Sequence, residues 1–180
     1  MPQLEFPVMN EAQQGSPEVL DSQVVEASSG DVDLMAFANQ FDDPSLRVKI
    51  EHLEGMMRQV ESHIEIKPVH RFAKGLYARE IFIPKGTLLT GKIHKQEHLN
   101  IVARGDISVL TEAGPQRIQA PCTIVSQPGT KRVGYAHEDT VWITVHATDV
   151  TDVEKIDAEL VVDTYEEYQT WALVFEQKGV

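Results

Sequence analysis

Three histidines have the spacing expected of ligands for a transition metal. His94 and His98 lie on either side of a short predicted turn, so both rings can face the same cavity. Further along the chain, His146 shares one face of a predicted strand with Trp142 and Thr144, because side chains alternate across a strand. Imidazole nitrogen is a good ligand for zinc, iron, nickel and copper. The sequence therefore offers His94, His98 and His146 as a candidate metal site.

Two basic residues near these histidines favour a different ligand. Lys92 and Arg132 would hold a carboxylate or phosphate through charge-assisted hydrogen bonds, and a cation disfavours a nearby divalent metal. In this interpretation six residues line one pocket: Lys92, His94, His98, Arg132, Tyr135 and His146. Two simpler interpretations stay open. The histidines can satisfy one another in a polar core, and a one-residue shift in register would turn Lys92 and Arg132 to solvent.

Short strands separated by turns make up residues 64–148. Turn sequences such as Pro84-Lys85-Gly86 and Arg104-Gly105-Asp106 punctuate them. The strand-like runs are 76–83, 87–93, 98–103, 107–111, 116–120, 123–126, 131–136 and 141–148. Many short strands at such regular intervals predict a β-sandwich or β-barrel.

Predicted helices flank the strands on both sides. In residues 44–62, after a possible N-cap at Asp43, apolar side chains recur every three or four positions, which predicts one amphipathic helix. The apolar positions are Leu46, Ile50, Leu53, Met57 and Val60. After the strands, Thr151-Asp-Val-Glu154 has the sequence of a capping box and predicts a helix to about residue 161. Residues 165–175 have a weaker helical pattern, so residues 151–180 are expected to form a helical tail.

The glycines and histidines of the strand region also follow a known pattern. The sequence Gly86-x5-Lys92-x-His94-x3-His98-x6-Gly105 resembles the first cupin motif, G-x5-H-x-H-x3/4-E-x6-G. Lys92 stands at the position of the first histidine ligand, and His98 stands at that of the glutamate. The resemblance implies that two of the family's metal ligands have changed.

The second cupin motif, G-x5-P-x-G-x2-H-x3-N, is less well matched. Gln127-Pro128-Gly129 supplies its turn, while Arg132 and Ala136 occupy the histidine and asparagine positions. The resemblance implies a mainly β fold: a single cupin-type jelly-roll barrel at 64–148 with one N-terminal helix, one or two C-terminal helices and a long flexible N-terminal arm. It also implies a homodimer, because cupins often pair through their sheets.

The charge of the chain is concentrated in its N-terminal arm, residues 1–43. The net charge is −12, yet residues 1–46 hold nine acidic residues and no Lys or Arg, which leaves the rest at −3. A surface without a basic patch argues against nucleic-acid binding. The apolar runs are too short to span a bilayer, and no secretory signal opens the chain, so we expect no membrane contact and a cytoplasmic location.

One segment of the arm has apolar residues at helical spacing. Leu34, Phe37 and Phe41 follow an i, i+3, i+7 pattern. They predict either a peptide that docks on a protein partner or a segment that folds back on its own barrel. Because the arm is otherwise polar, we expect deletion of residues 1–42 to leave the thermal transition nearly unchanged.

Two functions fit these features. The stretches YAREIFIPKGT, GKIHKQEHLN and PGTKRVGYAHEDTVW are similar to those of small uncharacterised cupin-like proteins of bacteriophages. The first hypothesis is therefore a non-catalytic binding or assembly module, in the host cytoplasm, a virion or an oligomer, with a pocket for a small anion. The second is a metal-dependent oxygenase, isomerase or lyase that uses zinc, iron or nickel. The changed ligand positions favour the first.

Overall fold

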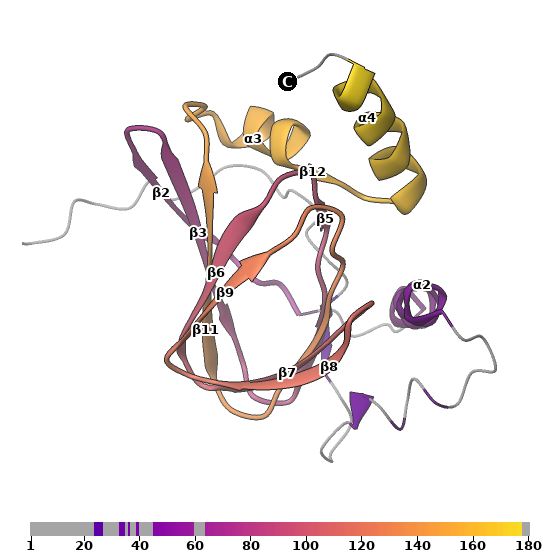
Figure 1. The fold of residues 1–180 in the computed structure, drawn as a ribbon. Coiled ribbons are helices and arrows are strands. Elements are labelled where there is room, and N and C mark those ends of the chain that lie inside the picture. Colours follow the sequence, from indigo (N-terminus) through magenta and orange to yellow (C-terminus); the bar gives the residue numbers. More distant parts are fainter. Residues whose placement is uncertain are drawn as a thin grey trace, which may run out of the picture.

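The computed structural model describes residues 24–26, 33, 34, 36, 39, 45–59 and 64–177, and its strands enclose a central barrel (Figure 1). In chain order its elements are β1 Val24–Glu26, α2 Leu46–Met57, β2 Val69–Ala73, β3 Leu76–Ile83, β4 Thr87–Thr90, β5 Ile93–His94, β6 His98–Arg104, β7 Asp106–Thr111, β8 Gly114–Gln119, β9 Cys122–Ser126, β10 Val133–Ala136, β11 Thr140–Ala147, α3 Val153–Leu160, β12 Val161–Val162 and α4 Tyr165–Gln177. The predicted mainly β fold with flanking helices is confirmed. Within the described residues, no helix has the length and apolar character needed to cross a membrane.

Two antiparallel sheets form the barrel. One has the strand order β1-β4-β10-β7-β8, the other has the order β2-β3-β11-β6-β9, and β12 pairs separately with β5. From β3 to β11 the chain passes back and forth between the two sheets, and these first and last barrel strands lie side by side. This winding of eight strands through two sheets is that of a jelly roll.

Three short strands and one helix start differ from the sequence predictions. β1, β2 and β12 were not predicted, since each is short and β12 directly follows a helix. Helix α3 begins after Asp152 rather than Thr151, because the Asp152 carboxylate accepts a hydrogen bond from the backbone N–H of Glu154 at 3.2 Å. The predicted N-cap Asp43 and the apolar residue Val60 lie outside the described residues.

The apolar core has three parts. The largest fills the barrel and includes Ile81, Ile107 and Trp142. A second lies between α2 and the outer surface of the β4-β10-β7 sheet, where Ile50 and Leu53 of α2 are buried as their spacing predicts. The third lies under α3. The helices therefore cover the barrel from the side and from one end (Figure 1).

The N-terminal arm contributes to the second part of the core. Val24 and Val25 of β1 are buried as that strand pairs with β4, and Leu34 is 3% exposed in the cluster around α2. Leu34 thus folds back onto its own barrel, which is the second of the two predicted alternatives, while partner binding through this segment stays a prediction. Phe37 and Phe41, the other two predicted docking residues, lie outside the described residues.

A buried ion pair also fixes α2 to the barrel. The Nζ atom of Lys131 lies 2.8 Å from Oε2 of Glu54, and these side chains are only 4% and 12% exposed. The hydroxyl of Thr90 donates a second hydrogen bond to the same carboxylate at 3.1 Å. The position of α2 therefore depends on polar contacts as well as on apolar packing.

Candidate metal centre

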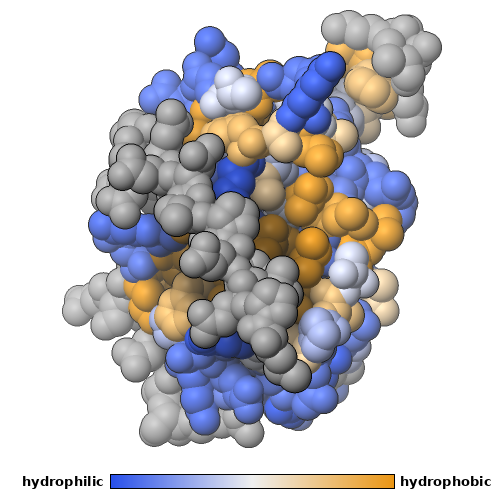
Figure 2. Space-filling model, turned by 90° about the vertical axis from the view of Figure 1, so that its left-hand side faces the viewer, coloured by the Kyte–Doolittle hydropathy of each residue, from blue (hydrophilic) through white to orange (hydrophobic). Residues whose placement is uncertain are grey.

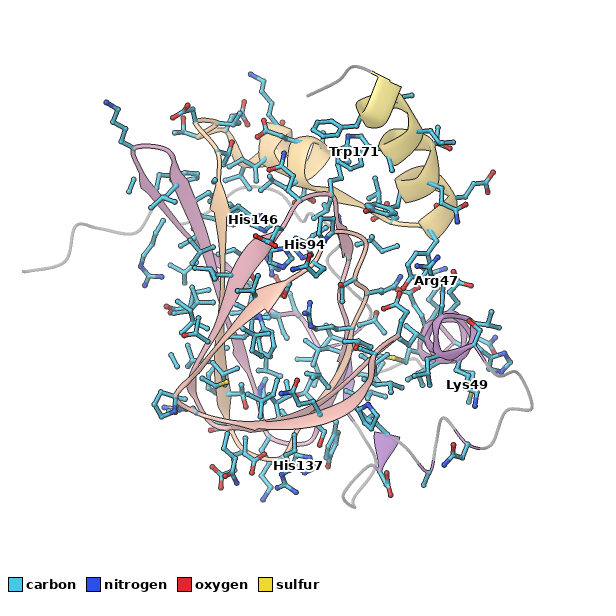
Figure 3. All side chains as sticks on the ribbon, in the orientation of Figure 1. Arg47, Lys49, His94, His137, His146 and Trp171 are labelled. Carbon is cyan, nitrogen blue, oxygen red and sulfur yellow. The ribbon has the colours of Figure 1, made fainter. Side chains whose placement is uncertain are left out.

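Three elements bring the predicted histidines together at one end of the barrel. His94 ends β5, His98 begins β6, and His146 lies near the end of β11. Their ring centroids are 4.1 to 4.9 Å apart, and one ring nitrogen from each lies within 4.8 Å of the other two. In Figure 3, His94 and His146 face each other at the end nearer α3, while His137 lies at the opposite end of the barrel. The grouping of His94, His98 and His146 expected from their spacing is therefore present.

One ring nitrogen of each histidine is buried and has no hydrogen-bond partner. Among the described residues, Nδ1 of His94, Nε2 of His98 and Nδ1 of His146 are buried and unpaired. The Nδ1–H of His98 donates to the backbone carbonyl of Gln96 at 3.0 Å, which leaves the lone pair on Nε2 free. A metal-bound histidine typically donates a hydrogen bond of this kind from the ring nitrogen that does not bind the metal, and this bond fixes the tautomer.

The electrostatics keep all three rings neutral, as a metal ligand requires. Burial, together with the neighbouring histidines, holds the pKa of His94 well below its usual value of 6.5. Burial likewise lowers the pKa of His98, and it lowers the pKa of His146 to about 3. Because ligands must be deprotonated to bind a metal, the three residues fit a transition metal chemically.

The two predicted cations have different surroundings. Lys92 lines the cavity, but its Nζ lies 2.9 Å from a carboxylate oxygen of Asp157 and 3.7 Å from one of Asp163, so its charge is offset. Arg132 also lines the cavity and donates from Nη2 to the hydroxyl of Ser126 at 2.6 Å. Lys92 is therefore not a free cation that would repel a metal from the histidines.

Tyr135 does not belong to the pocket. Along β10 the side chains alternate, so Gly134 lines the cavity while Tyr135 is buried on the opposite face, in the cluster around α2. The prediction of Tyr135 as a pocket residue is wrong. Strand alternation could have shown this from the sequence, because residues 132 and 135 differ by an odd number of positions and cannot share one face of a strand.

A polar network that the sequence did not reveal lies beside the histidines. Asn100 accepts hydrogen bonds from the indole N–H of Trp142 at 2.8 Å and from the hydroxyl of Thr144 at 3.0 Å. Its amide N–H donates to Ser126, which also receives the bond from Arg132. Asn100 follows His98 by two positions in β6, so strand alternation could have found it. The network fixes the orientation of Arg132.

Most of these side chains line a cavity of about 120 Å³ inside the barrel: Asn100, Arg132, Trp142 and Thr144, together with His94 and His146. His98 and Ser126 lie behind this wall and are not among the lining residues. At one end the cavity is roofed by residues that follow the barrel in the sequence, Ile156, Asp157 and Leu160 of α3 and Val161 of β12. Two charged residues of the cavity were not predicted. Arg79 lies on the inward face of β3, and Asp157 lies 65 residues from the lysine with which it pairs.

Acidification of the metal-free protein is expected to reduce its stability. Unfolded histidines titrate near pH 6.5, whereas the pKa values of His94, His98 and His146 are all lower in the fold. Below pH 6.5 the unfolded chain therefore binds protons that the folded chain does not, and stability falls by up to about 1.4 kcal/mol per pH unit for each such histidine. For His146 this loss continues down to about pH 3.

Urea unfolding between pH 7.5 and 5.5 in the presence of a chelator measures this slope. His146→Gln is the matched variant, because it removes one of the three titrating groups and should make the slope shallower. Equal slopes in the two proteins would contradict a neutral, buried His146.

Comparison with known proteins finds similarity at the level of structure alone. No known family profile matches the chain, and no curated protein sequence matches it. Similar solved structures include an RmlC-like cupin from Shewanella frigidimarina, with 15% identity and a TM-score of 0.42 over 49% of this chain and 80% of that one. KdgF from Halomonas sp. has 19% identity and a TM-score of 0.41 over 49% and 81%. An acetylacetone dioxygenase from Acinetobacter johnsonii has 11% identity and a TM-score of 0.38 over 46% and 59%.

At these identities no conclusion about activity passes from those proteins to this chain. The three come from bacteria, and the resemblance to phage-encoded proteins stays a prediction. The evidence on the fold comes from the chain itself, in which the eight barrel strands form two four-stranded groups, β3-β11-β6-β9 and β4-β10-β7-β8. That strand order, wound around three inward-facing histidines, gives this chain a cupin-type jelly-roll fold.

Proposed function

We propose that the chain is a metal-dependent enzyme for a small molecule, with His94, His98 and His146 as the metal ligands. One observation carries the proposal: three neutral histidines converge with buried, unpaired ring nitrogens. A buried polar atom left without a partner costs about 1 to 3 kcal/mol, so a permanently empty cavity of this kind would be an expensive arrangement. A bound divalent ion removes that cost at all three residues.

The donor set also indicates which metals fit. Three neutral imidazoles suit zinc, iron and nickel better than the hard cations that prefer oxygen. Three protein ligands leave coordination positions open, as in catalytic rather than structural zinc sites. When bound there, such a metal supplies a Lewis acid that polarises an oxygen of the substrate or acidifies a bound water.

The chain's own residues supply position and exclusion of water. The carbonyl of Gln96 fixes the ring of His98, and the network of Asn100 and Ser126 holds Arg132 at the cavity wall. The ion pair between Lys92 and Asp157 holds α3 over the cavity. These contacts support a site that α3 partly covers, so that fewer solvent molecules compete with a bound compound.

Metal analysis of protein purified without a histidine tag tests the proposal. We expect close to one equivalent of a transition metal in the unmodified protein, and its loss in His98→Ala and in His146→Ala. His137→Ala is the matched control, since His137 bonds to Ser108 at the far end of the barrel. Protein that stays folded without metal, and takes up no added zinc, iron or nickel, would contradict the proposal and favour the non-catalytic module.

Self-association is a second proposal, supported by the outer surface of the β2-β3-β11-β6-β9 sheet. Four large apolar side chains on these strands are 41 to 55% exposed: Leu76, Phe82, Leu99 and Val125. Figure 2 shows hydrophobic residues gathered on this side of the molecule. Burial of such a surface against a second copy would remove it from water. Sedimentation analysis of the purified chain distinguishes a dimer from a monomer.

A further inference from the structure

The cavity changes from polar to apolar along the barrel axis. The register of β11 against β3 places His146 opposite Tyr77, Thr144 opposite Arg79, and Trp142 opposite Ile81. Successive layers are two residues apart along the strands, so the histidine layer lies about 13 Å from the Trp142 layer. Beyond the polar layers the wall is apolar, and its members are Ile81, Ile83, Leu89, Ile107 and Val109. The cavity thus suits a molecule with one polar end and one apolar end.

Arg132 determines the charge that the polar end should carry. Its guanidinium donates one hydrogen bond to a neutral hydroxyl, that of Ser126, and within the described part of the chain it forms no ion pair. The guanidinium is partly desolvated, and this burial lowers the pKa of Arg132. A partly desolvated guanidinium with free N–H groups favours a carboxylate, whose two oxygens match its fork.

The other groups at this end do not neutralise that positive charge. Glu112 attracts Arg132 but forms no ion pair with it, since its carboxylate pairs with Arg47. The charge of Lys92 is already offset by Asp157, and Arg79 is a second arginine that lines the cavity. A divalent ion on the histidines would add further positive charge. In both the metal-free and the metal-loaded protein, the polar end of the cavity therefore attracts an anion.

We propose that the cavity binds a small carboxylate with an apolar body, its carboxylate on Arg132 beside the histidines and its body against the apolar wall. The proposal names the ligand class of the site, and in that sense it rests on the proposed function. The volume limits the size, because an engineered cavity of about 150 Å³ holds one benzene molecule. A cavity of about 120 Å³ therefore suits a body of roughly four to six carbon atoms.

Titration with a series of simple acids, followed by NMR, tests this inference. The probes are acetate, butanoate, hexanoate and decanoate, with butanamide and hexanamide as neutral counterparts. Each is added to chelator-treated protein and to zinc-loaded protein. We expect the tightest binding for butanoate or hexanoate in both preparations, weaker binding for acetate and decanoate, and at least tenfold weaker binding for the amides.

Two variants that each remove one positive charge distinguish binding in the cavity from binding at the surface. Arg132→Gln should weaken hexanoate binding about 10- to 100-fold, as expected for a lost charge-assisted hydrogen bond. Arg104→Gln is the control, because Arg104 is an exposed barrel residue whose side chain is 61% accessible. The Arg104→Gln variant should bind hexanoate as tightly as the unmodified protein does. If Arg132→Gln fails to fold, the comparison of acids with amides in the unmodified protein decides the matter.

The outcomes separate this inference from the metal proposal. Unchanged binding in Arg132→Gln, or equal binding of acid and amide, would overturn the inference whether or not metal is present. Binding that requires zinc and ignores Arg132→Gln would make the carboxylate a metal ligand only, so the metal centre would stand and the role of Arg132 would fall. Binding to a protein that takes up no metal would support the inference and overturn the metal centre.

Discussion

Replacement of Lys131 by methionine is expected to lower the free energy of unfolding by about 3–5 kcal/mol, the usual effect of removing one partner from a buried ion pair. Lys131 and Glu54 lie 2.8 Å apart and are largely shielded from water. Without the lysine, the carboxylate of Glu54 keeps the hydroxyl of Thr90 and a longer contact of 3.4 Å to Arg58, whose side chain is 60% exposed. Denaturant unfolding at constant pH measures the loss.

The double variant Lys131→Met, Glu54→Leu is the control for this prediction. It removes both charges, so no unpaired carboxylate stays buried under α2, and an apolar pair of similar size is often as stable as the ion pair. We expect it to recover most of the stability lost by Lys131→Met. A double variant as unstable as the single one would show that the geometry of the pair, not the unpaired charge, determines the effect.

Deletion of residues 1–42 should destabilise the protein on the order of 5 kcal/mol, because three buried side chains are lost and each contributes about 1.5 to 3 kcal/mol. These are Val24, Val25 and Leu34, which are 6%, 4% and 3% exposed. The deletion also removes the hydrogen-bonded partner of β4. From the sequence we expected this deletion to leave the thermal transition nearly unchanged, whereas from the structure we expect a large loss of stability.

A shorter deletion separates the two parts of the arm. Removal of residues 1–22 keeps β1 and Leu34, so the difference between the two truncated proteins isolates their contribution. Thermal and urea unfolding of both proteins, beside the full chain, give this difference. Equal stability of the two truncated proteins would contradict a structural role for β1 and Leu34.

The sequence predicted those parts of the fold that depend on local pattern. Alternation of side chains identified the strand that carries His146, and helical spacing identified Ile50 and Leu53 as the buried face of α2. Gly105, placed at a turn by motif spacing, has a φ of +96° and lies so close to Thr140 that a Cβ would clash. Each of these features follows from a few neighbouring residues.

Features that depend on distant pairing were not predictable in the same way. β1 is only three residues long and lies in an acidic segment, so nothing local distinguishes it from its surroundings. Lys92 has the sequence position of a metal ligand, but its charge is offset by Asp157 of α3, which no spacing rule connects to it. The sequence therefore identified the histidines of the site and misjudged the electrostatics around them.

The roof formed by α3 and β12 has a consequence for kinetics. It joins the barrel through the apolar cluster of Ile156 and Leu160 with Tyr77, the short β5–β12 pairing, and the ion pair of Lys92 with Asp157. This attachment is smaller than the pairings between barrel strands, so this segment can open while the barrel stays folded. A compound bound beneath it would lie against Ile156, Asp157 and Leu160, so we expect its residence time to depend on the opening of α3 as well as on the strength of the polar contacts.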